Sequence, residues 1–451
     1  MKEEKRAAIA VFLNKFFPAA SLLLGLFSTM PVLGVVVRGR DVSFYRILFA
    51  LALLFLGICF LMKPRLKLGK KSLWLELWLF VGLIGCVCGM LFLNGPRAEW
   101  GQAARSYIPK VILLLAFCFL WQANEEADPL AEWIMRGFLL GCALNCLWAT
   151  IDAVGFYATG KSLNNILFYN YCVRNDIREH TLSLIFHGSI RSGGFNSDPA
   201  QLGFVAPVLF GYGLARKKPL PVFLAICGIA ASASTTGLVS AVLLLVFLLR
   251  PRSKDGIQNK FSKADRWMLV ILCALIALVL LLQGDRILPL AQDIFHRFAA
   301  RIQSSYLNNN GPDIRVRYVL QAPFAMRAVL PFMLFGSGFG TASLGYATTP
   351  EVLAVIGQSH DFAYDMENTF LAYIFDTGVV GFALFLITMG TLLFAYRKKY
   401  AARESAFAQS VYITVCVSLL SMLFYHYILF APQMMIFTIA LSRLDREAEA
   451  A

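Results

Sequence analysis

Residues 219–249 decide the fold: PLPVFLAICGIAASASTTGLVSAVLLLVFLL carries no charged side chain. About 20 apolar residues cross a bilayer as one helix, so these 31 residues are long for one helix and short for two full ones. Basic clusters flank them at residues 216–218 and 250–266. Lys and Arg gather in cytoplasmic loops, so both flanks belong on one side of a membrane. The stretch is therefore predicted to be a hairpin of two short helices that turns at residues 232–237.

The composition of the whole chain agrees with a membrane protein. Of 451 residues, 58% are apolar and 15% are charged, whereas an ordinary soluble domain has about 25% charged residues. A soluble core cannot bury so many apolar stretches, and the stretches lack the alternation of an outer-membrane barrel. The net charge of +14 fits basic cytoplasmic loops, so we expect no nucleic-acid partner. The predicted fold class is an all-α polytopic membrane protein.

The span count follows from the remaining apolar runs and from the placement of Lys and Arg. With the hairpin included, about 12 transmembrane helices are predicted, with both termini cytoplasmic, in a single membrane domain over residues 1–451. The other predicted spans are 16–37, 47–62, 77–93, 107–121, 133–156, 199–215, 267–284, 368–396 and two spans in 405–442 that are separated at Pro432.

Two long loops, residues 157–199 and 285–367, are predicted to face away from the cytoplasm. Loops of this length are usually functional or disordered. The first contains Arg191, followed by two glycines that allow close approach to a ligand and by a helix start at Pro199. Arginine is the preferred partner of phosphate, and a helix N-terminus adds positive charge. The alternative is an incidental arginine in a loop that enters a helix.

A second group of polar residues, Asp365–Phe370, lies at the end of the long loop and the start of a span. A carboxylate at a membrane edge either complements a helix N-terminus or acts as an acid or base. Glu367 is the candidate general base of this segment.

Three segments of the chain resemble the bacterial O-antigen ligase and O-antigen polymerase superfamily. They are GSGFG at 336–340, ENTF at 367–370 and DTGVVG at 376–381. Arg191 with its glycines, and the Ser/Thr-rich turn at 232–237, are also similar to motifs of this family. Ligases and many polymerases of this family have His where this chain has Glu367, and His360 lies seven residues earlier. Glu at this position looks more like polymerases of repeat units than like the ligase.

The resemblance implies a membrane-embedded glycosyltransferase of the C type, with no cofactor and no metal. Its donor would be an oligosaccharide on undecaprenyl diphosphate, and its product a surface polysaccharide such as O-antigen, capsule or exopolysaccharide. The resemblance assigns the diphosphate to Arg191 and to Arg315 or Arg317, and general-base catalysis to Glu367. Asn368 and His360 are further candidate substrate contacts.

The implied setting is the outer face of the bacterial inner membrane. The partners expected there are the lipid-linked donor and the bilayer, together with assembly proteins such as a flippase and a chain-length regulator.

Other classes of function stay open at this point. Within the same family, a ligase would transfer the finished polymer to lipid A core. In a different class, a flippase or transporter would bury charge near the membrane midplane. Asp152 is the best candidate for such a charge, although a hydrogen-bonded structural Asp is equally compatible with the sequence. A non-enzymatic scaffold of an assembly complex is the third class.

Overall fold

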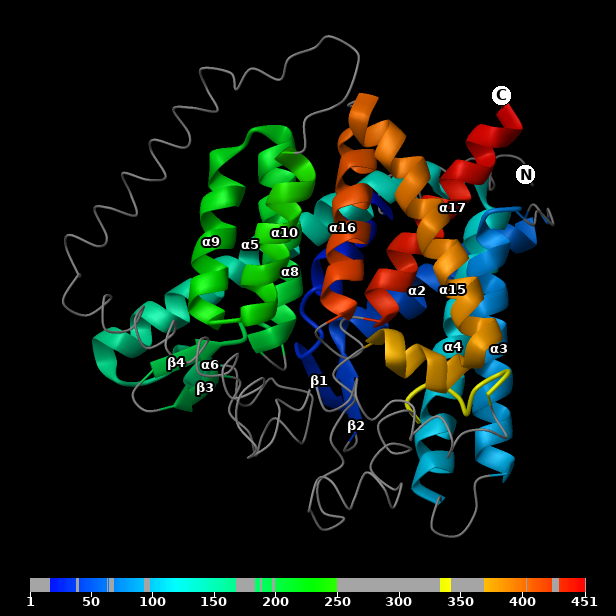
Figure 1. Cartoon of the computed structure of the whole chain (residues 1–451), viewed down its shortest axis with the longest axis horizontal. Helices are drawn as coiled ribbons and strands as arrows, with labels where there is room; N and C mark the ends of the chain where they lie inside the picture. The colour runs from blue at the N-terminus through cyan, green and yellow to red at the C-terminus, as the bar shows by residue number, and fades with distance from the viewer. Residues whose placement is uncertain are drawn as a thin grey trace, which may run out of the picture. The chain divides into compact units, whose positions relative to one another are not determined.

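The structure is a computed structural model that describes residues 17–37, 40–62, 64, 69–92, 98–167, 183–186, 189–196, 199–249, 333–341, 369–402, 404–423 and 430–450. These residues are mostly helical (Figure 1). They belong to two compact units. Unit 1 comprises 1–25, 46–137 and 314–451, and unit 2 comprises 26–45 and 138–313.

Five described helices are long and apolar enough to cross a membrane. This confirms a multi-pass helical membrane protein. The predicted span 267–284 lies outside the described residues, so the total of twelve stays a prediction. The five are α2 (Phe44–Met62), α3 (Ser72–Phe92), α4 (Ala98–Ala123), α5 (Asp128–Thr159) and α15 (Thr369–Ala402).

In unit 1, α3 packs against α4 and α15 (Figure 1). The core of this packing is aromatic. Trp78 of α3 lies 5.1 Å from Tyr373 and 5.0 Å from Phe385 of α15, measured between ring centroids. Phe339 completes the group at 5.3 Å from Trp78. All four rings are buried, so α3 and α15 are held as one body.

The last two helices of unit 1 are α16 (Ala406–Met422) and α17 (Phe430–Ala450). Both predicted helices are present, but Pro432 does not separate them. It lies in the first turn of α17, where proline is tolerated because that turn has no helical partner for its N–H groups. At the other end of α17, Asp445 accepts bonds from Lys71 N (2.8 Å) and Ser72 N (2.9 Å), and so caps α3.

In unit 2, three short helices lie side by side (Figure 1). They are α8 (Pro199–Arg216), α9 (Pro219–Ser232) and α10 (Thr235–Leu249). The predicted hairpin over 219–249 and its turn at 232–237 are therefore confirmed. Ala233 makes the turn with a left-handed backbone (φ 45°).

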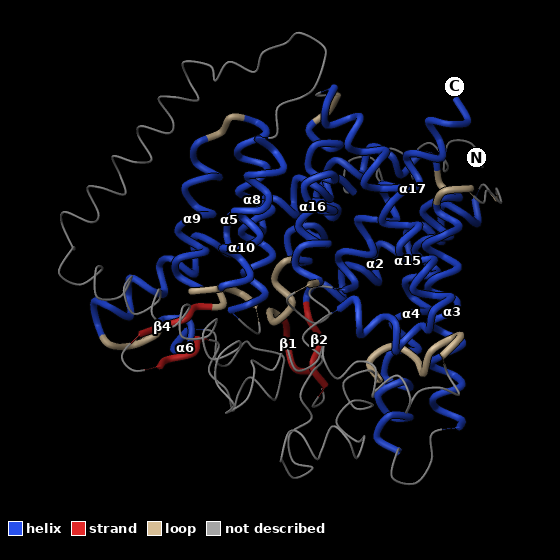
Figure 2. Tube along the Cα trace, viewed as in Figure 1, coloured by secondary structure: helices blue, strands red, loops and turns tan. Residues whose placement is uncertain are grey.

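Two antiparallel strand pairs depart from a purely helical fold (Figure 2). The first pair is β1 (Gly34–Val37) with β2 (Arg40–Ser43), and the second is β3 (Ser183–Phe186) with β4 (Ser189–Ser192). Of the predicted first span, 16–37, the structure shows an apolar helix over Phe17–Ser28. The predicted C-terminal bound was wrong, because Gly34–Val37 form the strand β1. Pro31 cannot continue a helix, and the β-branched residues Val35–Val37 favour a strand.

Candidate functional site

The helix α15 is broken at Gly378, whose backbone is not helical (φ 66°, ψ −176°). A break at this point removes the helical bonds from Phe375 to Val379 and from Asp376 to Val380, which leaves two carbonyls and two N–H groups without helical partners. Inside a membrane each such group needs another partner within the protein. The site is built around the segment that supplies these partners.

Residues 333–341, yellow in Figure 1, form a turn that replaces all the lost bonds. N–H groups of the turn donate to the two carbonyls of α15, and carbonyls of the turn accept from its two N–H groups. The GSGFG motif and the DTGVVG motif are therefore two halves of one structure. The bonds are Ser337 N to Phe375 O (3.0 Å), Gly338 N to Asp376 O (2.9 Å), Val379 N to Met333 O (2.9 Å) and Val380 N to Leu334 O (3.2 Å).

We call these four backbone bonds between residues 333–341 and α15 the interlock. The carboxylate of Asp376 adds side-chain hydrogen bonds to it. Its Oδ2 accepts from Gly340 N at 3.1 Å, and its Oδ1 accepts from the Thr341 hydroxyl at 3.4 Å. Asp376 is fully buried. A buried carboxylate is tolerated when hydrogen bonds satisfy it, so Asp376 has a structural task here.

Close contact between two backbone segments explains why glycine occupies positions 336 and 378. Gly336 (φ 76°) and Gly378 have left-handed backbones, which non-glycine residues rarely adopt. A Cβ on Gly336 would overlap the backbone of Asp376, and a Cβ on Gly378 would overlap the backbone of Leu334. Glycine is therefore required on both sides of the contact.

The interlock sets the position of residues 369–377, the first part of α15. This short helical piece begins directly after Glu367 and Asn368 in the chain. The predicted residues Glu367, Asn368, His360, Arg315 and Arg317 themselves lie outside the described residues. Their roles therefore stay predictions.

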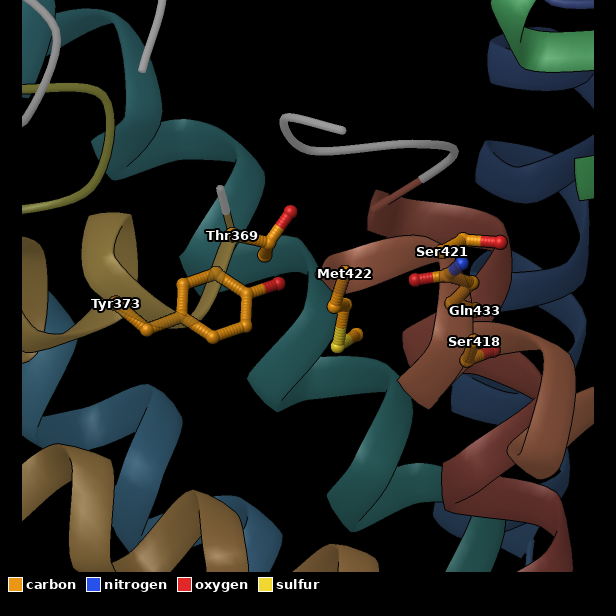
Figure 3. A pocket seen from close by; sticks show the side chains of 6 residues that line it. All are labelled: Thr369, Tyr373, Ser418, Ser421, Met422 and Gln433. Atoms are coloured by element: carbon orange, nitrogen blue, oxygen red, sulfur yellow. The ribbon is translucent and has the colours of Figure 1, made fainter. Parts of the chain in front are cut away.

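A small crevice opens beside the start of α15 (Figure 3). Five of its six lining residues carry a hydroxyl or an amide, but the crevice is too small to admit a ligand. Ser421 is 1% exposed, and its hydroxyl has no hydrogen-bond partner among the residues that the structure describes. In Figure 3 Met422 lies between Tyr373 and Thr369 on one side and Ser418, Ser421 and Gln433 on the other. The lining residues are Thr369, Tyr373, Ser418, Ser421, Met422 and Gln433.

Arg191 is the one predicted site residue that the structure describes, and it belongs to unit 2. It lies on β4, opposite Leu184 of β3. Its Nε donates to the carbonyl of Ser232, the last residue of α9, at 3.2 Å. The side chain is half-buried. Two motifs that are 41 residues apart, the arginine motif and the Ser/Thr-rich turn, are thus brought together.

The first turns of α8 and α10 meet beside this contact. A Cβ on Gly203 of α8 would lie 3.0 Å from Gly237 N of α10. Ser234 caps α10 by accepting from Gly237 N at 3.2 Å. Arg191 contacts the C-terminal end of α9, three residues before α10 begins at Thr235.

The sequence reasoning missed a buried polar cluster in unit 2. Asn145, Asp152 and Asn164 are each fully buried. Asp152 had been open to two interpretations, and its bonds favour the structural one: Oδ1 accepts from the Ser162 hydroxyl and from Asn164 N, both at 2.9 Å. The signal that was available is an asparagine inside the otherwise apolar α5, because a buried amide is retained only where it is bonded.

Comparison with known proteins gives one family. Residues 220–386 match the family model described as O-antigen ligase. No curated protein matches the chain. The matched segment includes the α9–α10 hairpin, the turn at 333–341 and the broken start of α15, while Arg191 precedes it. Over this segment the chain is similar to the O-antigen ligase family, in agreement with the resemblance of its motifs.

Proposed function

We propose that this protein polymerises undecaprenyl-diphosphate-linked oligosaccharide units into a surface polysaccharide, at the outer face of the inner membrane. The observation that carries the proposal is the interlock between the turn at 333–341 and the break at Gly378. It joins two family motifs and holds the start of α15, which begins two residues after Glu367. A rigid support is what a catalytic side chain requires.

In the proposed reaction Glu367 accepts the proton of an acceptor hydroxyl. The hydroxyl oxygen attacks the anomeric carbon of the donor sugar and inverts it. The bond from that carbon to the diphosphate oxygen breaks, and undecaprenyl diphosphate leaves with the electron pair. Asn368 orients Glu367 or the sugar, and His360 is the alternative contact in the same segment.

The leaving diphosphate develops negative charge, which fixed positive groups stabilise. We assign this task to Arg191 and to Arg315 or Arg317. For Arg191 the support is its bond to the carbonyl of Ser232, at the end of α9 and three residues before α10 begins at Thr235. A guanidinium is a suitable partner for a diphosphate, because its planar fork matches phosphate oxygens. No step of this reaction calls for a nucleotide sugar or a metal ion.

The glutamate at position 367 favours polymerase over ligase, because the ligases resembled here have His at this position. Glycan profiling of a deletion strain distinguishes the two. A single repeat on the final acceptor indicates a polymerase, and a finished polymer stranded on its lipid carrier indicates a ligase. A flippase would instead leave lipid-linked units on the inner leaflet.

The direct test of the proposed function is Glu367→Gln in a complemented deletion strain. The amide keeps the shape of the side chain but accepts no proton, so polymer is expected to be absent while the protein is inserted normally. Glu351→Gln, a change of the same type in the same predicted loop, is the matched control and should restore polymer. Polymer of normal length from Glu367→Gln would refute the catalytic assignment.

A further inference from the structure

The loop that follows Arg191 is held by side chains that reach it from two helices. Asn145 of α5 accepts, through Oδ1, a bond from Phe195 N at 2.9 Å and one from Asn196 Nδ2 at 3.0 Å. Its own Nδ2 donates to the carbonyls of Thr29 and Gly141, both at 3.0 Å. The Asn145 side chain thus forms hydrogen bonds through both its oxygen and its nitrogen, and the oxygen is the atom that accepts from the loop.

Asn164, in the short helix α6 (Leu163–Leu167), holds the same loop from another side. Its Nδ2 donates to the carbonyl of Gly194 at 2.9 Å. Its Oδ1 accepts from Trp148 Nε1 at 3.2 Å, and the Trp148 ring is stacked on Phe195 with centroids 5.7 Å apart. Asp152 in turn accepts from Asn164 N and so fixes the start of α6.

These contacts constrain the backbone within five residues of Arg191. Gly194 has a left-handed backbone (φ 62°), and the Asn196 amide is bonded back to the Gly193 carbonyl at 3.1 Å. A turn of this kind is stable only where its polar groups are satisfied. The satisfying groups are the two asparagine side chains, which are buried in unit 2 and do not themselves belong to the loop.

We propose that Asn145 and Asn164 are positioning residues for Arg191. They fix the loop at 193–196, and the loop fixes the direction in which β4 presents the guanidinium. The ligand concerned is the diphosphate of the lipid-linked donor, so this inference rests on the proposed function of Arg191. Misplacement of a binding group by about 1 Å can cost on the order of a hundredfold in rate, which makes such support consequential.

The first test measures the loop itself by hydrogen exchange of the backbone amides at 190–196, in the purified full-length protein. Asn145→Leu removes the acceptor of Phe195 N, and Asn164→Ala removes the donor to Gly194. Both variants should exchange about tenfold faster in this segment, as expected for a locally opened loop. Because Asn164 lies in α6 and not in a membrane helix, Asn164→Ala keeps the test valid if Asn145→Leu fails to fold.

Thr150→Val is the matched control for both variants. Thr150 lies in α5, and its hydroxyl donates to the Cys146 carbonyl of the same helix at 2.7 Å, with no bond to the described residues of the loop. Its loss leaves every contact of the loop intact, so exchange at 190–196 should stay unchanged. Unchanged exchange in Asn145→Leu and Asn164→Ala as well would overturn the inference.

The second test is kinetic and uses a lipid-linked repeat unit as donor. Asn164→Ala should raise the donor KM about tenfold with a smaller change in kcat, which is the pattern of a lost binding contact. In an Arg191→Ala background the same change should add less than about twofold, because residues that act as one unit are not additive. Multiplicative effects would show that Asn164 acts independently of Arg191.

The proposed function and this inference can fail separately. If Arg191→Ala raises the donor KM while Asn164→Ala leaves it unchanged, the positioning role is refuted and the diphosphate role stands. If Arg191→Ala itself leaves the donor KM unchanged, the diphosphate role is refuted. Positioning of this arginine then plays no part in donor binding.

Discussion

The Arg191 loop and the turn at 333–341 solve the same problem by different means. Each is an irregular, glycine-containing segment that must be held rigid at the end of a helical unit. The turn at 333–341 is held mainly by backbone-to-backbone bonds with the broken helix α15. The loop at 193–196 is held mainly by side-chain amides from α5 and α6. The first arrangement depends on the absence of side chains, and the second depends on particular side chains.

This difference predicts which substitutions each region tolerates. A backbone interlock accepts changes of side chain but not the addition of a Cβ at its contact points. A loop held by side-chain amides accepts an added Cβ where that atom meets its neighbours without overlap, but it does not accept the loss of an amide. The predictions below test this contrast, and each uses thermal unfolding of the purified protein in detergent.

The largest effect is expected for Gly336→Ala. The added Cβ is disfavoured by the left-handed backbone and would overlap the Asp376 backbone. The free energy of unfolding should therefore fall by about 2–5 kcal/mol. Gly160→Ala is the matched control, because Gly160 also has a positive φ (73°) but open space where its Cβ would lie. It should cost only about 1–2 kcal/mol. Equal losses of unfolding free energy in the two variants would mean that the contact of Gly336 with the Asp376 backbone does not contribute to stability.

An intermediate effect is expected for Asp376→Asn. The amide has the same shape but presents one donor group to a site that supplies donors from Gly340 and Thr341. A buried donor without an acceptor costs about 1–3 kcal/mol. Thr377→Val is the neighbouring control, since among the described residues the Thr377 hydroxyl bonds to the Tyr373 carbonyl of its own helix and to no group of the turn at 333–341. A smaller loss for Asp376→Asn than for Thr377→Val would argue against a side-chain contribution to the interlock.

The smallest effect is expected for Gly194→Ala. Its Cβ would lie 3.0 Å from the carbonyl oxygen of Asn145 and 3.1 Å from Oδ1, which is tight but not overlapping. The cost should be close to that of the left-handed backbone alone, about 1–2 kcal/mol. A loss as large as that of Gly336→Ala would show that the loop held by side-chain amides is as rigid as the backbone interlock, and would remove the contrast.

The sequence by itself determined the class of the molecule and much of its outline. Apolar length predicted the long helices α2 to α5 and α15, and the basic flanks of residues 219–249 predicted a hairpin that the structure confirms. These features were predictable because they depend on local composition and on charge at the ends of spans. The motifs predicted the family in the same way, from residue order and spacing.

Only the tertiary structure decided what the motif residues do. Asp376 accepts a hydrogen bond from Gly340, 36 residues away in the sequence. Asn145 accepts one from Phe195, 50 residues away. Hydrogen bonds between distant segments leave no periodic signal in a sequence. The C-terminal bound of the first predicted span was wrong for a related reason: apolar length alone does not distinguish a helix from the strand pair β1–β2, which forms only because Arg40–Ser43 folds back on Gly34–Val37.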